Sequence, residues 1–336
     1  MKRRSIAVLF AIVAFSLVAV SGNLVAQSLW KPTHPIQVVV PWPAGGASDT
    51  VGRMLAGQME QFIGQRMVIV NTAGGSGAIG TQEVWDKPHD GYTLTANAVA
   101  SVVSYAVLGK MDQTHRDWIY YLPIFTPNVI VVKGDSPIKT LAQLMDYMKS
   151  KPGATILSSA GVGSSGYYAA ELFKKATGLT YRHVPYAGGA PAVMAVAQGE
   201  AEVVMQLSVE VAELLRGGKL RALAVTSADD LVVDGYGTIP SAQKTIPNFP
   251  NYGSYFGIMA PADLPANVIA ALDAAFVKAA AAQGVKDYAK IKGAIPSAIY
   301  GKEATALTEK LASTEAWLLY DAGAAAKSPS VFNIPR

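Results

Sequence analysis

Short runs of apolar, often β-branched residues alternate along this chain with stretches in which apolar residues recur every three or four positions. The first pattern is typical of buried strands and the second of helices that bury one face. Up to residue 95 the patterns predict a strand at 36–40, a helix at 50–63, a strand at 67–70, a helix at 78–85 and a strand at 92–95. Strands that alternate with helices predict a parallel sheet with helices on its faces.

The same alternation begins again after Pro137. Thr140 is a suitable N-cap for a helix at 141–149, and Pro152-Gly153 ends that helix. Beyond it the patterns predict strands at 155–158, 183–185, 202–207 and 220–226, and helices at 165–177, 190–198 and 209–216. The chain therefore predicts a second α/β unit organised like the first.

Two extended apolar segments, 128–133 and 252–260, connect these units, and prolines flank both of them. Helical patterns return after Pro265, at 266–282 and 302–320, and we expect this tail to pack on the first unit. We therefore predict a two-lobe α/β protein in which each lobe is a mainly parallel sheet flanked by helices and two strands form the hinge. The expected boundaries place residues 27–128 and 253–336 in lobe 1 and residues 129–252 in lobe 2.

Residues 1–26 have the features of an export signal. Three basic residues, Lys2, Arg3 and Arg4, precede an apolar run at 6–20, and Ala26 ends a suitable cleavage site. The run is too short for a stable membrane-spanning helix, although the alternative is an uncleaved N-terminal anchor. We therefore expect cleavage near Ala26 and a mature protein outside the cytoplasm.

Charge and cysteine content narrow the chemistry further. The 336 residues carry a net charge of +4, but the three cations of the leader account for most of it, so we expect no nucleic-acid partner. The absence of cysteine from the sequence excludes disulfides, thiolate metal sites and cysteine nucleophiles. The four histidines, at positions 34, 89, 115 and 183, lack the short spacing of a local metal motif, and we predict no metal site.

Glycine and small polar residues gather where predicted strands end and helices begin. At 41–49 adjacent glycines turn backbone N–H groups toward a guest, and Ser48 or Asp49 can cap the helix that follows. The first turn of a helix leaves unpaired N–H groups, which attract anions. The alternative is an ordinary glycine-rich connector with a capped helix.

The second junction contains Gly75-x-Gly77-x-x-Gly80, which matches the letters of a dinucleotide-binding fingerprint. That function requires an acidic residue about twenty positions later, at the end of the next strand. The segment 95–100 offers Asn97 and no acidic residue. We therefore expect no nucleotide cofactor, only glycine amides at the start of a helix.

Two loops of the same kind, 158–166 and 183–190, belong to the second unit. A serine-hydrolase motif would need glycine where Val162 or Tyr167 stands, so this motif is absent. His183 is a candidate base or a structural hydrogen-bonding group. Together the four loops predict a cleft at the carboxyl ends of the strands. Because few charged residues lie in them, backbone N–H and hydroxyl groups would hold an anion there, which favours reversible capture.

Seven short blocks of this chain stand in a specific order and spacing. The blocks are 41–50, 78–80, 90–94, 164–166, 183–186, 188–192 and 217–227. Over about residues 35–265 the chain resembles the substrate-binding proteins of tripartite tricarboxylate transporters, the Bug-type extracytoplasmic receptors.

This resemblance implies a periplasmic-binding-protein (Venus flytrap) fold and a periplasmic receptor that captures a small organic carboxylate between its lobes. It also implies delivery to the membrane subunits of a tripartite tricarboxylate-type transporter, a monomeric state, and no catalysis or cofactor. Carried over by position, the ligand contacts would be Trp42, Ala44, Gly45, Ser48, Asp49, Ala78, Ile79, Ser101, Ser164, Ser165, Tyr186 and Gly188.

Gln206, which we also expect at the ligand, departs from the family pattern because many relatives carry Asp there. An amide is neutral and both donates and accepts, so Gln206 weakens the expectation of an amino-acid ligand and permits a less polar or more anionic distal group. The apolar stretch 101–105 favours a hydrophobic ligand body. Two alternatives stay open: a secreted hydrolase or lyase that would use Asp49 and His183, and a sensor that reports ligand occupancy to a membrane kinase.

Overall fold

The computed structural model of the protein describes residues 29–336. The expected leader and its cleavage point at Ala26 lie outside the described residues. Among residues 29–336 no single helix combines the length and apolar character needed to cross a membrane. The helices 266–280 and 283–292 reach that length and composition only as a pair, and they meet at a bend of 59°.

Strands and helices alternate through most of the described chain. The strands are β1 (Ile36–Val40), β2 (Met67–Asn71), β3 (Thr93–Ala98), β4 (Trp118–Lys133), β5 (Ile156–Ser159), β6 (Arg182–Pro185), β7 (Val203–Leu207), β8 (Leu220–Val225), β9 (Leu231–Val233), β10 (Gly237–Ile239), β11 (Gly253–Pro261) and β12 (Ile295–Ile299). The α-helices are α2 (Ala47–Ile63), α3 (Ala78–Trp85), α4 (Val99–Tyr105), α5 (Leu141–Ser150), α6 (Ser165–Thr177), α7 (Gly189–Gln198), α8 (Ser208–Arg216), α9 (Ala266–Ala280), α10 (Gln283–Lys292) and α11 (Gly301–Asp321). Short 3-10 turns lie at Gly75–Gly77, His115–Asp117, Ala242–Lys244 and Pro329–Phe332.

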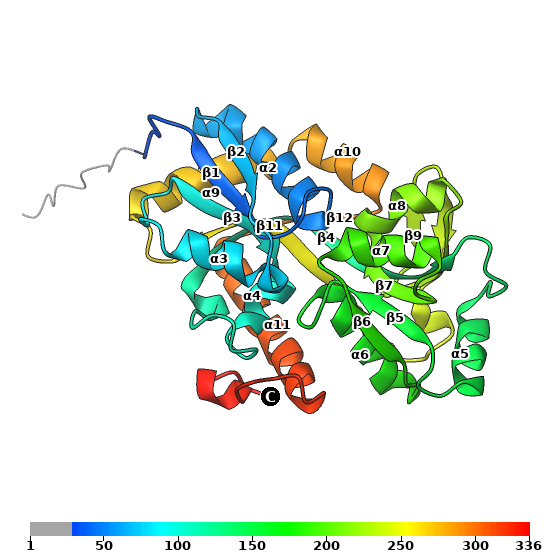
Figure 1. Cartoon of the computed structure of the whole chain (residues 1–336). Coiled ribbons are helices and arrows are strands. Elements are labelled where there is room, and N and C mark those ends of the chain that lie inside the picture. The colour runs from blue at the N-terminus through cyan, green and yellow to red at the C-terminus, as the bar shows by residue number, and fades with distance from the viewer. Residues whose placement is uncertain (1–28) are drawn as a thin grey trace, which may run out of the picture.

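The strands form two lobes that share one strand (Figure 1). Strands β1, β2 and β3 pair in parallel in the first lobe, and β5, β6 and β7 pair in parallel in the second. Between them the order β3-β11-β4-β7 continues the sheet through antiparallel pairs. The predicted two-lobe α/β fold is confirmed.

Strand β4 belongs to both lobes. Its first part, up to Pro127, pairs with β11, and its second part, from Asn128, pairs with β7 and β8. The sequence patterns predict only the second part, because Pro123 and Pro127 interrupt the first. Pro123 is tolerated because the register of β4 and β11 shifts beside it, opposite Gly257.

Apolar side chains on the helices cover both faces of the sheet. In the first lobe Leu55 and Met59 of α2 and Phe276 of α9 pack on Val38 of β1. In the second lobe Phe173 of α6 packs with residues of β5 and β7. These faces follow from the 3.6-residue period of the helices and the apolar runs of the strands.

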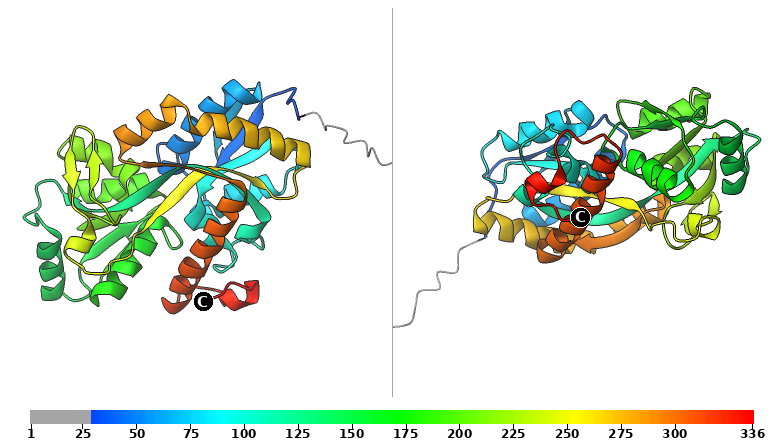
Figure 2. Two further views of the ribbon diagram at one scale, coloured as in Figure 1. Left: turned by 180° about the vertical axis from the view of Figure 1, so that it is seen from behind. Right: turned by 90° about the horizontal axis from the view of Figure 1, so that it is seen from below.

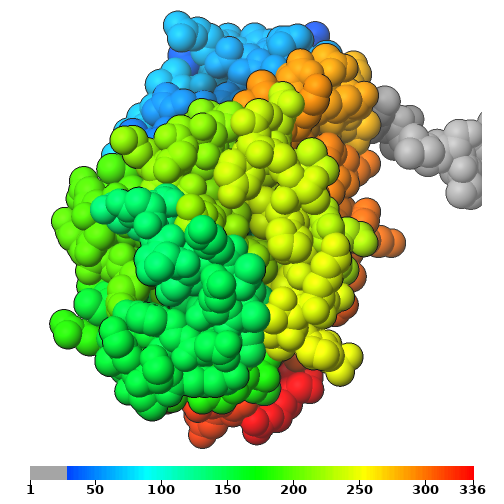
Figure 3. All heavy atoms as spheres, turned by 90° about the vertical axis from the view of Figure 1, so that its right-hand side faces the viewer, coloured from blue at the N-terminus to red at the C-terminus, as the bar shows by residue number. Residues whose placement is uncertain are grey.

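The C-terminal tail touches both lobes. Helix α9 packs on α2, α10 lies between α2 and α8, and α11 contacts α4 and α6. In Figure 2 the orange-to-red tail returns along the first lobe and reaches the junction with the second. Figure 3 shows orange atoms of the tail against the yellow-green atoms of the second lobe. The expected packing on the first unit is therefore accompanied by contacts with the second.

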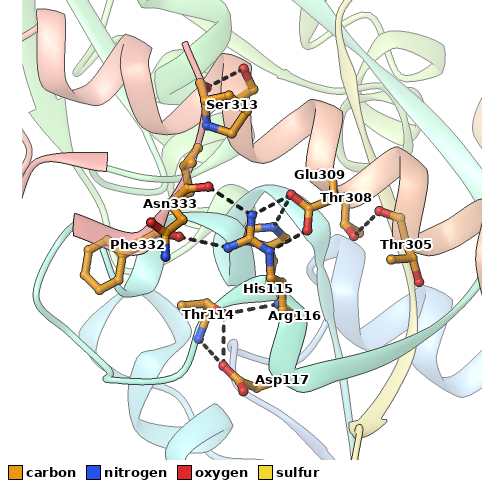
Figure 4. A network of polar contacts seen from close by, with 12 residues as sticks. Thr114, His115, Arg116, Asp117, Thr305, Thr308, Glu309, Ser313, Phe332 and Asn333 are labelled. Carbon is orange, nitrogen blue, oxygen red and sulfur yellow. Dashed lines mark hydrogen bonds and ion pairs between the residues drawn. The ribbon is translucent and has the colours of Figure 1, made fainter. Parts of the chain in front are cut away.

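Arg116 fixes the end of this tail (Figure 4). Its guanidinium group forms two hydrogen bonds with the carboxylate of Glu309 on α11, and it also donates to the carbonyl oxygens of Phe332 (2.8 Å) and Asn333 (3.2 Å). The hydrogen bonds from Arg116 lower the pKa of Glu309. One side chain in the first lobe thus holds both the last helix and the segment after it.

Candidate functional site

A cavity lies between the two lobes, at the carboxyl ends of β1, β3, β5 and β7. It encloses about 460 Å³, counting the space open to solvent at its mouth. The first lobe lines it with Trp42, Pro43, Gly46, Ala47, Ser48, Ala98, Ser101 and Phe256. The second lobe lines it with Ala160, Ser164, Ser165, Gly188, Gly189, Ala190, Pro191, Gln206, Leu207 and Glu210.

The first-lobe wall is built around the start of α2. Gly46 holds the N-cap position without a side-chain cap, so the prediction that Ser48 or Asp49 caps this helix is wrong. The first-turn amides of α2 have no acceptor within their own helix, and they lie at the cavity. Trp42 forms an apolar wall beside them, because its indole N–H is already donated to Asn97 Oδ1 at 2.9 Å.

The second-lobe wall contains the starts of α6 and α7. At α6 the N-cap Ser164 accepts a hydrogen bond from the amide of Tyr167 through Oγ (3.3 Å), and Ser165 Oγ donates to Asn128 Oδ1 at 2.8 Å. At α7 the N-cap is Gly188, again without a side-chain cap. Three helix N-termini, those of α2, α6 and α7, therefore meet at one cavity, and each carries a partial positive charge.

Glu210 joins the two walls. It lies in the first turn of α8, and its Oε1 accepts a hydrogen bond from the amide of Ala47 in the other lobe at 2.9 Å. Its Oε2 accepts from Nε2 of Gln206 at 2.7 Å. Burial raises the pKa of Glu210, and the hydrogen bonds from Ala47 and Gln206 oppose this rise.

Glycines make room for the Gln206–Glu210 pair. A Cβ atom on Gly189 would lie 2.1 Å from Oε2 of Glu210 and 2.3 Å from Nε2 of Gln206. A Cβ atom on Gly166 would lie 2.2 Å from Oε1 of Gln206. No real Cβ tolerates these distances, so the small residues at the starts of α6 and α7 are needed for this close approach.

Seven of the residues expected at a ligand line the cavity. They are Trp42, Ser48, Ser101, Ser164, Ser165, Gly188 and Gln206. Glu210 also lines the cavity but is not among the residues predicted from the sequence, although one feature of the sequence indicates it. It is an acidic residue in the first turn of a helix that directly follows a strand, one helical turn after Gln206, at the sheet edge where the other loops meet.

The other six expected residues lie outside this lining. Ala44 and Gly45 form an exposed turn, whereas Asp49 is buried. The carboxylate of Asp49 accepts hydrogen bonds from the amide of Gly45, from Arg53 and from Asn71. Burial alone would raise the pKa of Asp49, but these hydrogen bonds outweigh it and lower the pKa. Asp49 therefore organises the loop before α2.

Ala78, Ile79 and Tyr186 also lie away from the cavity. Ala78 and Ile79 line a separate surface hollow beside α3, and Ile79 is 57% exposed there. The hydroxyl group of Tyr186 donates to Glu200 at 3.3 Å. The geometry thus concentrates the candidate site on the starts of α2, α6, α7 and α8.

His183 and Asp49, the candidate acid–base pair, each have a structural partner. Nε2 of His183 lies 2.7 Å from Oγ of Ser159, and burial lowers the pKa of His183. Asp49 is engaged by Arg53, and neither residue lines the cavity. Within residues 29–336 no three His, Asp or Glu side chains are grouped so that they would hold a metal ion.

The family profile described as the tripartite tricarboxylate transporter family receptor matches residues 51–305. This chain belongs to that family. Among individual relatives of this receptor, a UPF0065 protein from the tcbD-tcbE intergenic region of Pseudomonas sp. strain P51 is 33% identical over 265 residues, which cover 78% of each chain. BugT of Bordetella pertussis is 28% identical over 270 residues, which cover 79% of this chain and 82% of BugT.

Solved structures agree with the family assignment. The R. palustris protein Rpa4515, solved with adipate, is 26% identical with a TM-score of 0.78, and the alignment covers 88% of this chain and 99% of that one. A structure described as a periplasmic transporter is 27% identical with a TM-score of 0.77, over 90% of this chain and 99% of that one. BugD, at 24% identity and a TM-score of 0.78, shares the fold. The expected resemblance to the Bug-type receptors is confirmed.

Proposed function

We propose that this receptor-family protein captures a small organic carboxylate in the cavity between its lobes, in the periplasm. It then delivers the carboxylate, unchanged, to the membrane subunits of a tripartite tricarboxylate-type transporter. In this proposal the leader at 1–26 exports the chain, which acts as a monomer without catalysis, cofactor or nucleic-acid partner. The observation that carries the proposal is the meeting of three helix N-termini at one cavity.

Helix N-termini suit reversible binding of a carboxylate. Their first-turn N–H groups point out of the helix and donate to an anion, and the aligned peptide dipoles favour negative charge. Trp42, Leu207 and Phe256 supply apolar surface for the carbon skeleton of a ligand. No Arg or Lys lines the cavity within the described chain, so main-chain and hydroxyl donors provide the attraction.

In this proposal the lobes separate to admit a ligand, because the two walls approach each other closely at two points. A Cβ atom on Gly188 would lie 3.2 Å from Cδ of Pro43, and a Cβ atom on Gly161 would lie 3.0 Å from Oγ of Ser76. In this proposal the lobes, 27–128 with 253–336 and 129–252, rotate about β4 and β11. A ligand that contacts both walls stabilises the closed state relative to the open one.

A paired binding measurement tests the proposal. A thermal-shift screen over small carboxylic acids identifies binders, because a ligand of the native state raises the melting temperature. Calorimetry then compares the tightest acid with its primary amide, which has nearly the same size and no charge. We expect the acid to bind at least about tenfold more tightly, since hydrogen bonds to a charged group are worth roughly 1.5–3 kcal/mol.

Equal affinities for the acid and the amide would contradict capture by helix N-termini. The fate of the ligand separates a receptor from an enzyme that would use the same cavity. After a day with stoichiometric protein, NMR of the filtrate should show the acid intact. Any conversion that depends on the protein would favour the hydrolase or lyase alternative.

A further inference from the structure

Glu210 is the one ionisable side chain among the described residues that line the cavity. A carboxylate at this place is unexpected in a site that attracts anions. It already occupies one of the donors that such a site offers, the amide of Ala47 at 2.9 Å. A ligand therefore enters a cavity that already contains a carboxyl group.

The hydrogen bonds of Glu210 favour its ionised form. Its two oxygens accept from the amide of Ala47 and from Nε2 of Gln206, and both of these groups can only donate. Burial acts in the opposite direction, because it disfavours charge. The geometry presents Glu210 as an acceptor that is fixed by both lobes when they are closed.

The cavity still has donors for the carboxylate of a ligand. The first-turn amides of Ser48 at α2, Ser165 at α6 and Ala190 at α7 have no acceptor within their own helices, and these residues line the cavity. A ligand carboxylate bound there leaves the rest of the ligand beside Glu210. Two carboxylates at such short range repel each other, whereas an ammonium or hydroxyl group would donate to Glu210.

We propose that Glu210 determines the charge class of the ligand: the cavity takes a carboxylate whose other end carries an ammonium or hydroxyl donor, and it disfavours dicarboxylates. This proposal rests on the function proposed above and narrows the class of carboxylate that the protein captures. It also revises the expectation from Gln206 alone, which permitted a more anionic distal group. Many relatives carry a carboxylate at position 206, where this chain has the neutral amide of Gln206. In this chain Glu210, one helical turn later, supplies a carboxylate instead.

A matched ligand series tests this assignment. Butanoate, 4-hydroxybutanoate, 4-aminobutanoate and succinate share four carbons and differ in the distal group, and the five- and six-carbon series repeat the comparison. For the wild-type protein we expect the tightest amino or hydroxy acid to bind at least about tenfold more tightly than the dicarboxylate of the same length. In Glu210→Gln the dicarboxylate should gain about tenfold and the amino acid should lose about as much.

Two further variants separate charge from folding. Glu210→Asp keeps the charge, so it should keep the wild-type order of ligand classes even if all affinities fall. Glu213→Gln removes another carboxylate of the same helix. The side chain of Glu213 is 62% exposed and pairs with Lys292 and Arg216, so this substitution should leave the ligand affinities unchanged. Far-UV circular dichroism of each variant checks that it is folded.

Two results would overturn the assignment. The first is a wild-type protein that prefers dicarboxylates, and this result is decisive even if Glu210→Gln fails to fold. The second is an identical order of ligand classes in wild type and Glu210→Gln. In both cases carboxylates still bind, so the proposed function stands. A wild-type protein that binds no carboxylate of any class would overturn the proposed function as well.

Discussion

Glu315 on α11 is a buried acid whose carboxyl group accepts a single hydrogen bond. It is 1% exposed, and its Oε1 accepts from the hydroxyl group of Tyr252 at 3.0 Å. No partner for Oε2 exists among the described residues. Burial raises the pKa of Glu315 to about 8, although the hydrogen bond from Tyr252 opposes the rise. At neutral pH this residue is therefore held largely protonated beside the segment that enters β11.

This pKa predicts a pH-dependent stability. The folded protein binds the proton of Glu315 more tightly than the unfolded chain does, so its stabilising effect is complete below about pH 4.5 and is lost as pH rises toward about 8. Between pH 5 and 7 the free energy of unfolding should lose roughly 1.4 kcal/mol per pH unit from this group. Glu315→Gln should lack that slope. Urea unfolding of both proteins at pH 5, 6 and 7 measures it, and parallel curves would contradict the prediction.

At the scale of elements, the starts of helices matter most to this protein. Those of α6, α7 and α8 are closely packed around Gln206 and Glu210, with glycines at the contact points. A glycine in a helix normally destabilises it by roughly 0.5–1 kcal/mol relative to alanine. Gly189 at the start of α7 is therefore explained by the space that the side chains of Glu210 and Gln206 occupy.

Gly189→Ala should weaken the binding of the best ligand, because its Cβ would displace the carboxylate of Glu210 and the amide of Gln206. We expect a loss of about tenfold or more in calorimetry, together with a lower melting temperature. Gly57→Ala in α2 is the matched control, since no atom lies within 4 Å of its added Cβ. It should leave affinity unchanged and raise stability by up to about 1 kcal/mol. Equal behaviour of the two variants would refute this account.

Elements defined by local patterns were predictable, and those set by distant contacts were not. The strand at 36–40 and the helices at 78–85 and 165–177 have the predicted bounds, because apolar runs, caps and glycines fix them locally. The first part of β4 was hidden by Pro123, which only the register shift opposite Gly257 makes acceptable. Glu210 was missed for a similar reason, because its role depends on Ala47, 163 residues away in the chain.

At the scale of the whole molecule, the C-terminal tail contacts both lobes and ties them together. Leu318 and Leu319 near the end of α11 belong to the same apolar cluster as Phe173 of the second lobe. Glu309 and the carbonyl groups of Phe332 and Asn333 are held by Arg116 of the first lobe. The placement of the tail is therefore part of how the lobes sit relative to each other.

Arg116→Ala should release the end of the tail. The ion pair with Glu309 is partly exposed and contributes little, so most of the loss comes from the hydrogen bonds to Phe332 and Asn333. We expect a decrease of about 1–2 kcal/mol in the free energy of unfolding. Limited proteolysis with mass spectrometry should also show faster cleavage after residue 321. Lys149→Ala removes an exposed pair with Asp146 on α5, away from the tail, and serves as the control, and a tail that stays protected in Arg116→Ala would argue against this role.

The strand shared by the two lobes has a consequence for dividing the protein. A fragment that ends at Pro127 would keep the first part of β4 but lose its partners β11 and β12, which lie later in the chain, and the remaining fragment would hold β11 and β12 without that neighbour. Unpaired strand edges of this kind offer N–H and C=O groups to other chains and promote aggregation. We therefore expect two fragments cut at this strand to aggregate instead of folding separately.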